Sequence, residues 1–110
     1  MLAHDPTLSR EILLGLWKVH ILHHASEGPL VGQWMMEELR SHCYRVSPGT
    51  LYPLLKRMER NGWLRSEADP TAGPKGRREY FLTDEGRAVL SRVRGFVQEL
   101  HSELCEESES

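Results

Sequence analysis

Basic side chains gather in the middle of this 110-residue sequence, where they could bind a polyanion. Residues 40–78 carry nine basic and three acidic side chains, a formal charge of +6, whereas residues 1–39 carry −3 and residues 79–110 carry −5. The whole chain has a formal charge of −2, so its average composition does not mark a nucleic-acid binder. Because lysine and arginine attract phosphate groups, we expect the middle segment to face nucleic acid and the acidic C-terminal segment to point away from it.

The basic segment begins with the pattern of a capped helix. Ser47-Pro48 is a typical helix start, because serine caps a helix N-terminus and proline is tolerated at the first helical position. Asn61-Gly62 is a typical helix end, since both residues accept a left-handed backbone. The buried face of this helix is predicted to hold Leu51, Leu54, Leu55 and Met58. The side chains predicted to project away from that face are Thr50, Tyr52, Lys56 and Arg57.

Two helices before this segment, and a hairpin after it, would position the basic side chains. Apolar residues at steps of three and four predict helices over residues 8–25 and 31–42. Alternating residues predict strands over 63–68 and 78–82, and the turn-rich loop 69–77 between them ends in basic side chains.

A last helix is predicted from Thr83, which can cap it, with an acidic first turn that suits the positive end of the helix dipole. The apolar residues of this helix are spaced so that one side is continuous for about four turns. Residues 106–110 are expected to be disordered.

This order of elements predicts a mainly α fold with a small β-hairpin, namely a winged helix-turn-helix plus a C-terminal dimerisation helix. In such modules the third helix enters the major groove of DNA. The wing reaches the flanking backbone or the minor groove. We expect residues 1–82 to form the DNA-binding domain, and residues 83–110 to form the dimerisation helix and an acidic tail.

The run from Ser47 to Leu64, followed by residues 76–86, resembles the signature of the PadR family of transcriptional regulators. The resemblance covers the middle of the chain and the start of its C-terminal part. It implies a winged-helix dimer that binds operator DNA and usually represses, with the C-terminal helix packing against the partner's N-terminal helix. The single short C-terminal helix is similar to that of the family's smaller members, which leaves little room for a separate ligand-binding domain.

Residue by residue, the resemblance places Ser47, Thr50, Tyr52 and Pro53 on the family's recognition-helix motif and residues 75–78 on its wing. Together with the cations of the predicted third helix, the candidate DNA-contacting residues are Ser47, Gly49, Thr50, Tyr52, Pro53, Lys56, Arg57, Lys75, Arg77 and Arg78.

Two features of the third helix leave alternatives open. A proline at about the sixth helical position costs roughly 3 kcal/mol in an ordinary helix, so Pro53 either marks a functional site or starts a new helical segment after an irregular turn. Lys56 and Arg57 either contact phosphates or lie on a solvated face, and Lys56 could instead pair with Glu59 three residues on.

The apolar stripe of the last helix has two explanations, packing within the chain or a dimer seam. Because a small core of three helices would not cover four turns of apolar surface, we expect a homodimer. The candidate interface residues are Leu13, Leu16, Trp17, Val89, Val93, Phe96, Leu100 and Leu104.

Six histidines raise the possibility of metal binding. His20 and His24 are four residues apart on a predicted helix, as are His101 and Cys105, and the resemblance implies that these helices meet across the dimer. The alternative is favoured, that His20, His23 and His24 lie near a helix C-terminus and only meet the helix dipole and solvent, so no metal or other cofactor is predicted.

A small-molecule effector is a further possibility. Trp17, Trp34 and Phe96 could line an aromatic pocket at the dimer centre for a flat ligand, although aromatic residues at helical spacing are usually core.

Other classes of protein find little support. No nucleophile lies beside a base at motif spacing and no glycine-rich phosphate loop is present, so an enzyme is not predicted. No apolar run is long enough to cross a membrane, and a cytoplasmic location is expected.

The predicted function is a homodimeric repressor that occludes a two-fold symmetric promoter site in double-stranded DNA. The alternatives are a winged-helix protein-interaction module without sequence-specific DNA binding, and a metal- or ligand-responsive form of the repressor.

Overall fold

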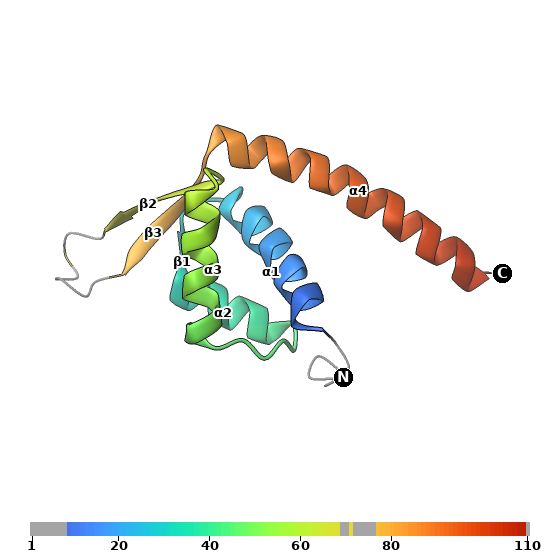
Figure 1. Cartoon of the computed structure of the whole chain (residues 1–110), viewed down its shortest axis with the longest axis horizontal. Helices are drawn as coiled ribbons and strands as arrows, with labels where there is room; N and C mark the ends of the chain where they lie inside the picture. The colour runs from blue at the N-terminus through green and yellow to red at the C-terminus, as the bar shows by residue number, and fades with distance from the viewer. Residues whose placement is uncertain (1–8, 69–70, 72–76, 110) are drawn as a thin grey trace.

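The computed structural model describes residues 9–68, 71 and 77–109, which form four helices and a three-stranded sheet (Figure 1). In chain order the elements are α1 (Arg10–Ala25), β1 (Leu30–Val31), α2 (Gly32–Ser41), α3 (Pro48–Arg60), β2 (Leu64–Ala68), β3 (Arg78–Leu82) and α4 (Asp84–Glu109). The wing β2–β3 extends from one side of the body and the outer part of α4 from the other. The expected fold, mainly α with a small hairpin, is confirmed.

One hydrophobic core joins the first three helices, the sheet and the beginning of α4. Each of these elements contributes residues that are almost completely buried, and no polar or charged residue of the described chain is buried with them. The core side chains that lose nearly all contact with solvent are Ile21, Leu22, Leu30, Met35, Leu39, Leu51, Leu54, Leu55, Met58, Leu64 and Leu90. The core therefore fixes α3 relative to the wing.

The ends of α3 and α4 follow the capping residues of the sequence. Gly62 has a left-handed φ of 84°, and the amide of Trp63 donates to the carbonyl of Met58 at 3.1 Å, which closes the helix end as predicted. Because Trp63 takes part in this turn, β2 begins one residue later than expected. At the start of α4, the Thr83 hydroxyl accepts from the amide of Gly86 at 2.9 Å, so the predicted cap is confirmed.

The sheet has one strand more than the sequence predicts. The expected helix from residue 31 begins at Gly32 instead, because Leu30 and Val31 form the short strand β1. The strand order is β1-β3-β2, and both pairs are antiparallel, with Leu30 opposite Tyr80 and Ser66 also opposite Tyr80. A two-residue strand is too short to produce an alternating pattern, which is why sequence periodicity missed it.

Two other boundaries differ from the expectation. α1 begins at Arg10 after its cap Ser9, whose hydroxyl accepts from the amide of Glu11 at 3.1 Å, and residue 8 lies outside the described part. The expectation of disorder is wrong for residues 106–109, because α4 continues to Glu109, and residue 110 lies outside the described residues. Glutamate is a good helix former, and nothing between residues 104 and 109 interrupts the helix.

None of the helices, over the residues that the structure describes, combines the length and the apolar character needed to span a membrane.

Candidate nucleic-acid interface

Helix α3 is buried on one side and exposed on the other, as its sequence predicts. Its four predicted core residues are all buried, whereas Pro53, Lys56 and Arg57 are exposed and Tyr52 is 40% exposed. The helix runs unbroken through Pro53, so the alternative that this proline starts a new helical segment is wrong. α3 therefore presents an aromatic ring, a proline and two cations on a single outward surface.

The first turn of α3 is organised by a contact with α1. Ser47 occupies the cap position, but its side chain makes no cap hydrogen bond to the backbone. Its hydroxyl instead donates to the Thr50 hydroxyl at 3.4 Å, and the Arg10 guanidinium donates to the same oxygen at 3.3 Å. Arg10 was missed by sequence reasoning, because a contact over forty residues leaves no local signal.

Tyr52 connects α3 with the first residue of α2. A β-carbon added at Gly32 would lie only 2.5 Å from Cε1 of the Tyr52 ring, which is closer than real contacts allow. The ring therefore covers the start of α2, and only glycine at position 32 lets it do so.

A surface groove of about 540 Å³ lies where α2, α3 and the wing meet. We call it the basic groove, and it is lined by Val31, Gly32, Gln33, Tyr52, Lys56, Arg77, Arg78 and Tyr80. Within the described residues, no acidic side chain forms an ion pair with any of its three cations. The three cations of the groove therefore have no direct ion-pair partner among the described residues.

Tyr80 lies almost completely buried at the floor of the basic groove. Burial raises the pKa of its hydroxyl, and the nearby Glu59 carboxylate raises that pKa further. The phenol is therefore neutral at physiological pH and can both donate and accept a hydrogen bond.

One wing arginine, Arg78, is held by a short network that reaches α3. Arg78 Nε donates to the Ser66 hydroxyl at 3.1 Å, and that hydroxyl donates to a Glu59 carboxylate oxygen at 2.8 Å. Glu59 is thus engaged with the wing, and the structure shows no Lys56–Glu59 ion pair. Arg77 is exposed directly before β3, at the end of the wing strands nearest the loop that joins them, and Lys75 lies outside the described residues.

The residues expected at a dimer interface divide into two groups. Val89 and Val93 are partly buried, whereas the outer part of α4 exposes Phe96 (63%), Leu100 (53%) and Leu104 (56%). Val97, which the sequence interpretation did not include, is 48% exposed beside them. The apolar surface of α4 that its own chain leaves uncovered therefore lies from Phe96 onward.

The α1 residues expected at the dimer interface also differ in their exposure to solvent. Leu16 is 45% exposed and Leu13 is partly buried, but Trp17 is only 4% exposed. The Trp17 ring packs edge-on against Tyr44 at 5.8 Å, so it belongs to the core of its own chain. Trp34 packs against His24 instead, and the aromatic pocket suggested by the sequence is not assembled within one protomer.

The four residues considered as metal ligands lie at two separate places. His101 Nε2 is 3.5 Å from Cys105 Sγ on the outer part of α4. His20 stacks on His24 at the end of α1, with ring centroids 6.5 Å apart. Burial, and then the imidazoles of His42 and His24, lower the pKa of His20.

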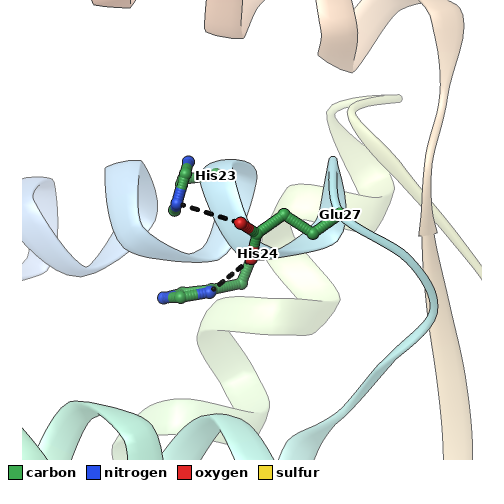
Figure 2. A group of neighbouring side chains, drawn as sticks. All are labelled: His23, His24 and Glu27. Atoms are coloured by element: carbon green, nitrogen blue, oxygen red, sulfur yellow. Dashed lines mark hydrogen bonds and ion pairs between the residues drawn. The ribbon is translucent and has the colours of Figure 1, made fainter.

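The structure brings a different group together at the same end of α1, namely His23, His24 and Glu27 (Figure 2). The spacing of four residues between His23 and Glu27 was the signal that could have revealed it.

Comparisons with known proteins agree with this geometry. The family model described as "Transcriptional regulator PadR-like family" matches residues 21–92. The transcriptional regulator Rv3488 of Mycobacterium tuberculosis is 45% identical over 95 residues, which cover 86% of this chain and 88% of that protein. A PadR family transcriptional regulator from Eggerthella lenta has a solved structure with a TM-score of 0.77 and 32% identity, covering 100% of this chain and 99% of that one. A PadR-like transcriptional regulator from Bacillus cereus, 28% identical, has a TM-score of 0.69 over 86% of this chain and 96% of its own.

Proposed function

The chain belongs to the PadR-like family of transcriptional regulators, and we propose that it is a homodimeric repressor that binds a two-fold symmetric operator in double-stranded DNA. The observation that carries this proposal is the basic groove, in which cations of α3 and of the wing face the same open surface without acidic partners. Such a surface suits a phosphate backbone on both sides of a major groove.

On the surface made by the basic groove and the neighbouring exposed side of α3, we assign positioning and reading to different side chains. Arg77, Arg78 and Arg57 would hold phosphates, which fixes the register of the protein on the duplex. Tyr52 and Lys56 project from α3 into the basic groove, and in a complex they would face the major groove of DNA. There they would contact base edges or a thymine methyl group. Thr50 would join them, and Ser47, Gly49 and Pro53 would shape the backbone approach at the start of α3.

Dimerisation is proposed from the exposed apolar part of α4. Leu90 of α4 is buried in the core, whereas Phe96, Leu100 and Leu104 are more than half exposed. We therefore propose residues 1–82 as the DNA-binding domain and residues 83–110 as the segment through which two copies associate, with Leu16 of α1 as a contact for the partner's α4. Repression would follow from occlusion of a promoter, in the cytoplasm, and no enzymatic activity is proposed.

The test is binding of the purified chain to a labelled fragment of its own upstream region and to random duplex of equal length, over a series of salt concentrations. We expect tight, salt-sensitive binding to the upstream fragment, and weakening of it by Thr50→Ala, Tyr52→Ala and Lys56→Ala. The matched control is Arg92→Ala, which removes an exposed cation from α4 and should leave binding unchanged.

Equal and weak binding of both fragments, unaffected by the α3 variants, would contradict the repressor. The better account would then be a winged-helix module that recognises another protein.

A further inference from the structure

The end of α1 holds a group of side chains that the proposed DNA contacts do not use. His23, His24 and Glu27 place one donor atom each within 4.8 Å of the others, and Figure 2 shows the Glu27 carboxylate between the two imidazole rings. Glu27 lies just after the C-terminal end of α1. Its side chain points back toward the last turn of the helix, where His23 and His24 lie. The group therefore combines two imidazole nitrogens and one carboxylate oxygen at one place.

Two of the three donor separations in this group fit a small tetrahedral ion. His24 Nδ1 lies 3.2 Å from Glu27 Oε1, and His23 Nε2 lies 3.6 Å from Glu27 Oε2. Donor atoms about 2.0–2.2 Å from a tetrahedral zinc ion are separated from each other by about 3.3–3.6 Å. The donor atoms of the two imidazoles lie within 4.8 Å of each other, and rotation of the side chains would direct the three donors at a common centre.

His24 Nε2, the ring nitrogen that would not bind the metal, lies beside a carboxylate, as is usual for histidines that bind metals. His24 Nε2 lies 3.4 Å from Glu38 Oε2 on α2, and the His24 side chain is only 13% exposed. Imidazoles that bind metals usually donate their other N–H to a carboxylate, which fixes the ring and makes the free nitrogen more basic. Glu38 supplies that carboxylate from outside the group of three.

We propose that His23, His24 and Glu27 bind a divalent transition-metal ion of the zinc class, with Glu38 as the positioning residue for His24. Three protein ligands leave one coordination position open to water. Imidazole and carboxylate donors suit zinc, cobalt and nickel better than calcium or magnesium. The site shares only His24 with the pairs that the sequence suggested, and it does not involve His101 or Cys105.

The proposed site is connected to α4 through His23. An Arg94 amino group of α4 lies 3.5 Å from His23 Nδ1, and because a guanidinium only donates, this contact requires an unprotonated Nδ1. A neutral imidazole that binds metal through Nε2 carries its proton on Nδ1, which can no longer accept from Arg94. Metal binding therefore breaks a contact between α1 and the helix that we propose for dimerisation.

The experiment is a calorimetric titration of the full chain, free of any purification tag, with zinc chloride. We expect saturable binding of one zinc ion per chain, weakened more than about 10-fold by His23→Ala or by Glu27→Gln, and about 10-fold by Glu38→Gln. His101→Ala is the matched control, because His101 is an exposed histidine of α4 that lies outside the group of three, and it should leave the affinity unchanged. The titration uses DNA-free protein, so its outcome does not depend on whether the chain binds an operator.

Cobalt provides a second measurement at the same place. The Trp34 ring lies 5.2 Å from the His24 ring, so bound Co²⁺ should quench the emission of Trp34. Wild-type protein should lose emission saturably, whereas His23→Ala, and Trp34→Phe as the variant without the reporter, should not. Both replaced side chains are substantially exposed, so neither change removes a core residue, and far-UV circular dichroism checks that the variants are folded.

Absence of saturable zinc binding in the wild type would overturn the proposal. So would loss of binding in a His101→Ala, Cys105→Ser variant but not in His23→Ala, because the ion would then bind to α4.

The connection to α4 has its own test, since Arg94→Ala removes the competing contact and should tighten zinc binding by about 2- to 10-fold. Weaker zinc binding by Arg94→Ala would contradict that connection.

Discussion

Tyr52 lies over the first residue of α2, and its ring leaves no room for a β-carbon at Gly32. The exposed ring is thereby held in place between two helices without a hydrogen bond to its hydroxyl in the described chain. A side chain held in this way loses little further conformational freedom when it binds a ligand, which favours binding. The same contact makes the position of Tyr52 sensitive to a single methyl group on the neighbouring helix.

Gly32→Ala is therefore expected to weaken operator binding while leaving the fold intact. The new methyl group displaces the Tyr52 ring from its position. If Tyr52 loses one hydrogen bond to DNA in each complex, the affinity should fall by about 2- to 10-fold. Fluorescence anisotropy with the upstream fragment measures this change. Gly15→Ala on α1 is the matched control, because a β-carbon there meets no atom within 4 Å. Equal affinities of the Gly32→Ala variant and the wild type would show that Tyr52 does not contact DNA.

Arg57→Ala tests a phosphate contact and should act on all DNA sequences alike. Arg57 is exposed on α3, and no acidic side chain of the described residues forms an ion pair with it. Each phosphate contact contributes about −0.9 to the slope of log affinity against log salt, so a dimer with two such contacts should lose about 1.8 from that slope. Binding of operator and random duplex over a salt series measures it, and a slope equal to that of the wild type would place Arg57 on a solvated face.

At the scale of elements, α4 makes a close approach to the body near its start. A β-carbon at Gly86 would lie 2.1 Å from the carbonyl oxygen of Trp63, a backbone atom that cannot swing aside. Thr83 also bonds the carbonyl of Gly62, so the turn after α3 and the start of α4 are held together. The direction in which α4 leaves the body follows from this contact.

Gly86→Ala is accordingly expected to lower the free energy of unfolding by about 1–3 kcal/mol, the usual cost of inserting a methyl group into a tightly packed site. Gly95→Ala on the same helix is the matched control, because a β-carbon there meets nothing within 4 Å of its own chain. Alanine should stabilise that position by roughly 0.5–1 kcal/mol through its higher helix propensity. Urea unfolding of both variants gives the two values, and a Gly86→Ala variant as stable as the wild type would contradict the close approach.

The elements that could be predicted are those marked by local signals. The sequence predicted the helix end at Gly62, the cap at Thr83 and the strand Arg78–Leu82, because each depends on neighbouring residues. Contacts between distant residues leave no such signal, and so β1, the Arg10–Thr50 bond and the approach of Tyr52 to Gly32 were missed. Trp17 shows a related limit, since an apolar residue on a helix stripe can face its own core or a partner.

For the whole molecule, the outward direction of α4 makes one protomer more extended than a compact domain with the same number of residues. The radius of gyration is 15.4 Å, whereas a compact domain of this length has about 13 Å. The excess comes from the outer part of α4, which extends beyond the body in Figure 1 and carries the exposed apolar residues. A second copy that covers this surface would remove it from water and would place two α3 helices on one duplex. Half-sites about one helical turn, roughly 34 Å, apart would then be recognised together.

Leu100→Glu is expected to separate such a dimer into monomers. Leu100 is 53% exposed on the apolar side of α4, and a carboxylate there would be buried without a partner when two copies meet. Sedimentation velocity should give about twice the chain mass of 12.7 kDa for the wild type and the single-chain mass for the variant at equal concentration. The fold should be unchanged, because Leu100 lies outside the core of its own chain.

Gln98→Glu is the matched control for this change, since it places the same side chain on α4 at an exposed position away from the apolar stripe. It should remain dimeric and should bind the operator as the wild type does. Leu100→Glu should keep weak binding to random duplex but lose the tight complex, because each protomer then occupies a half-site alone. A monomeric wild type with tight operator binding would contradict the dimer, whereas a dimeric Leu100→Glu variant would place the interface on another surface.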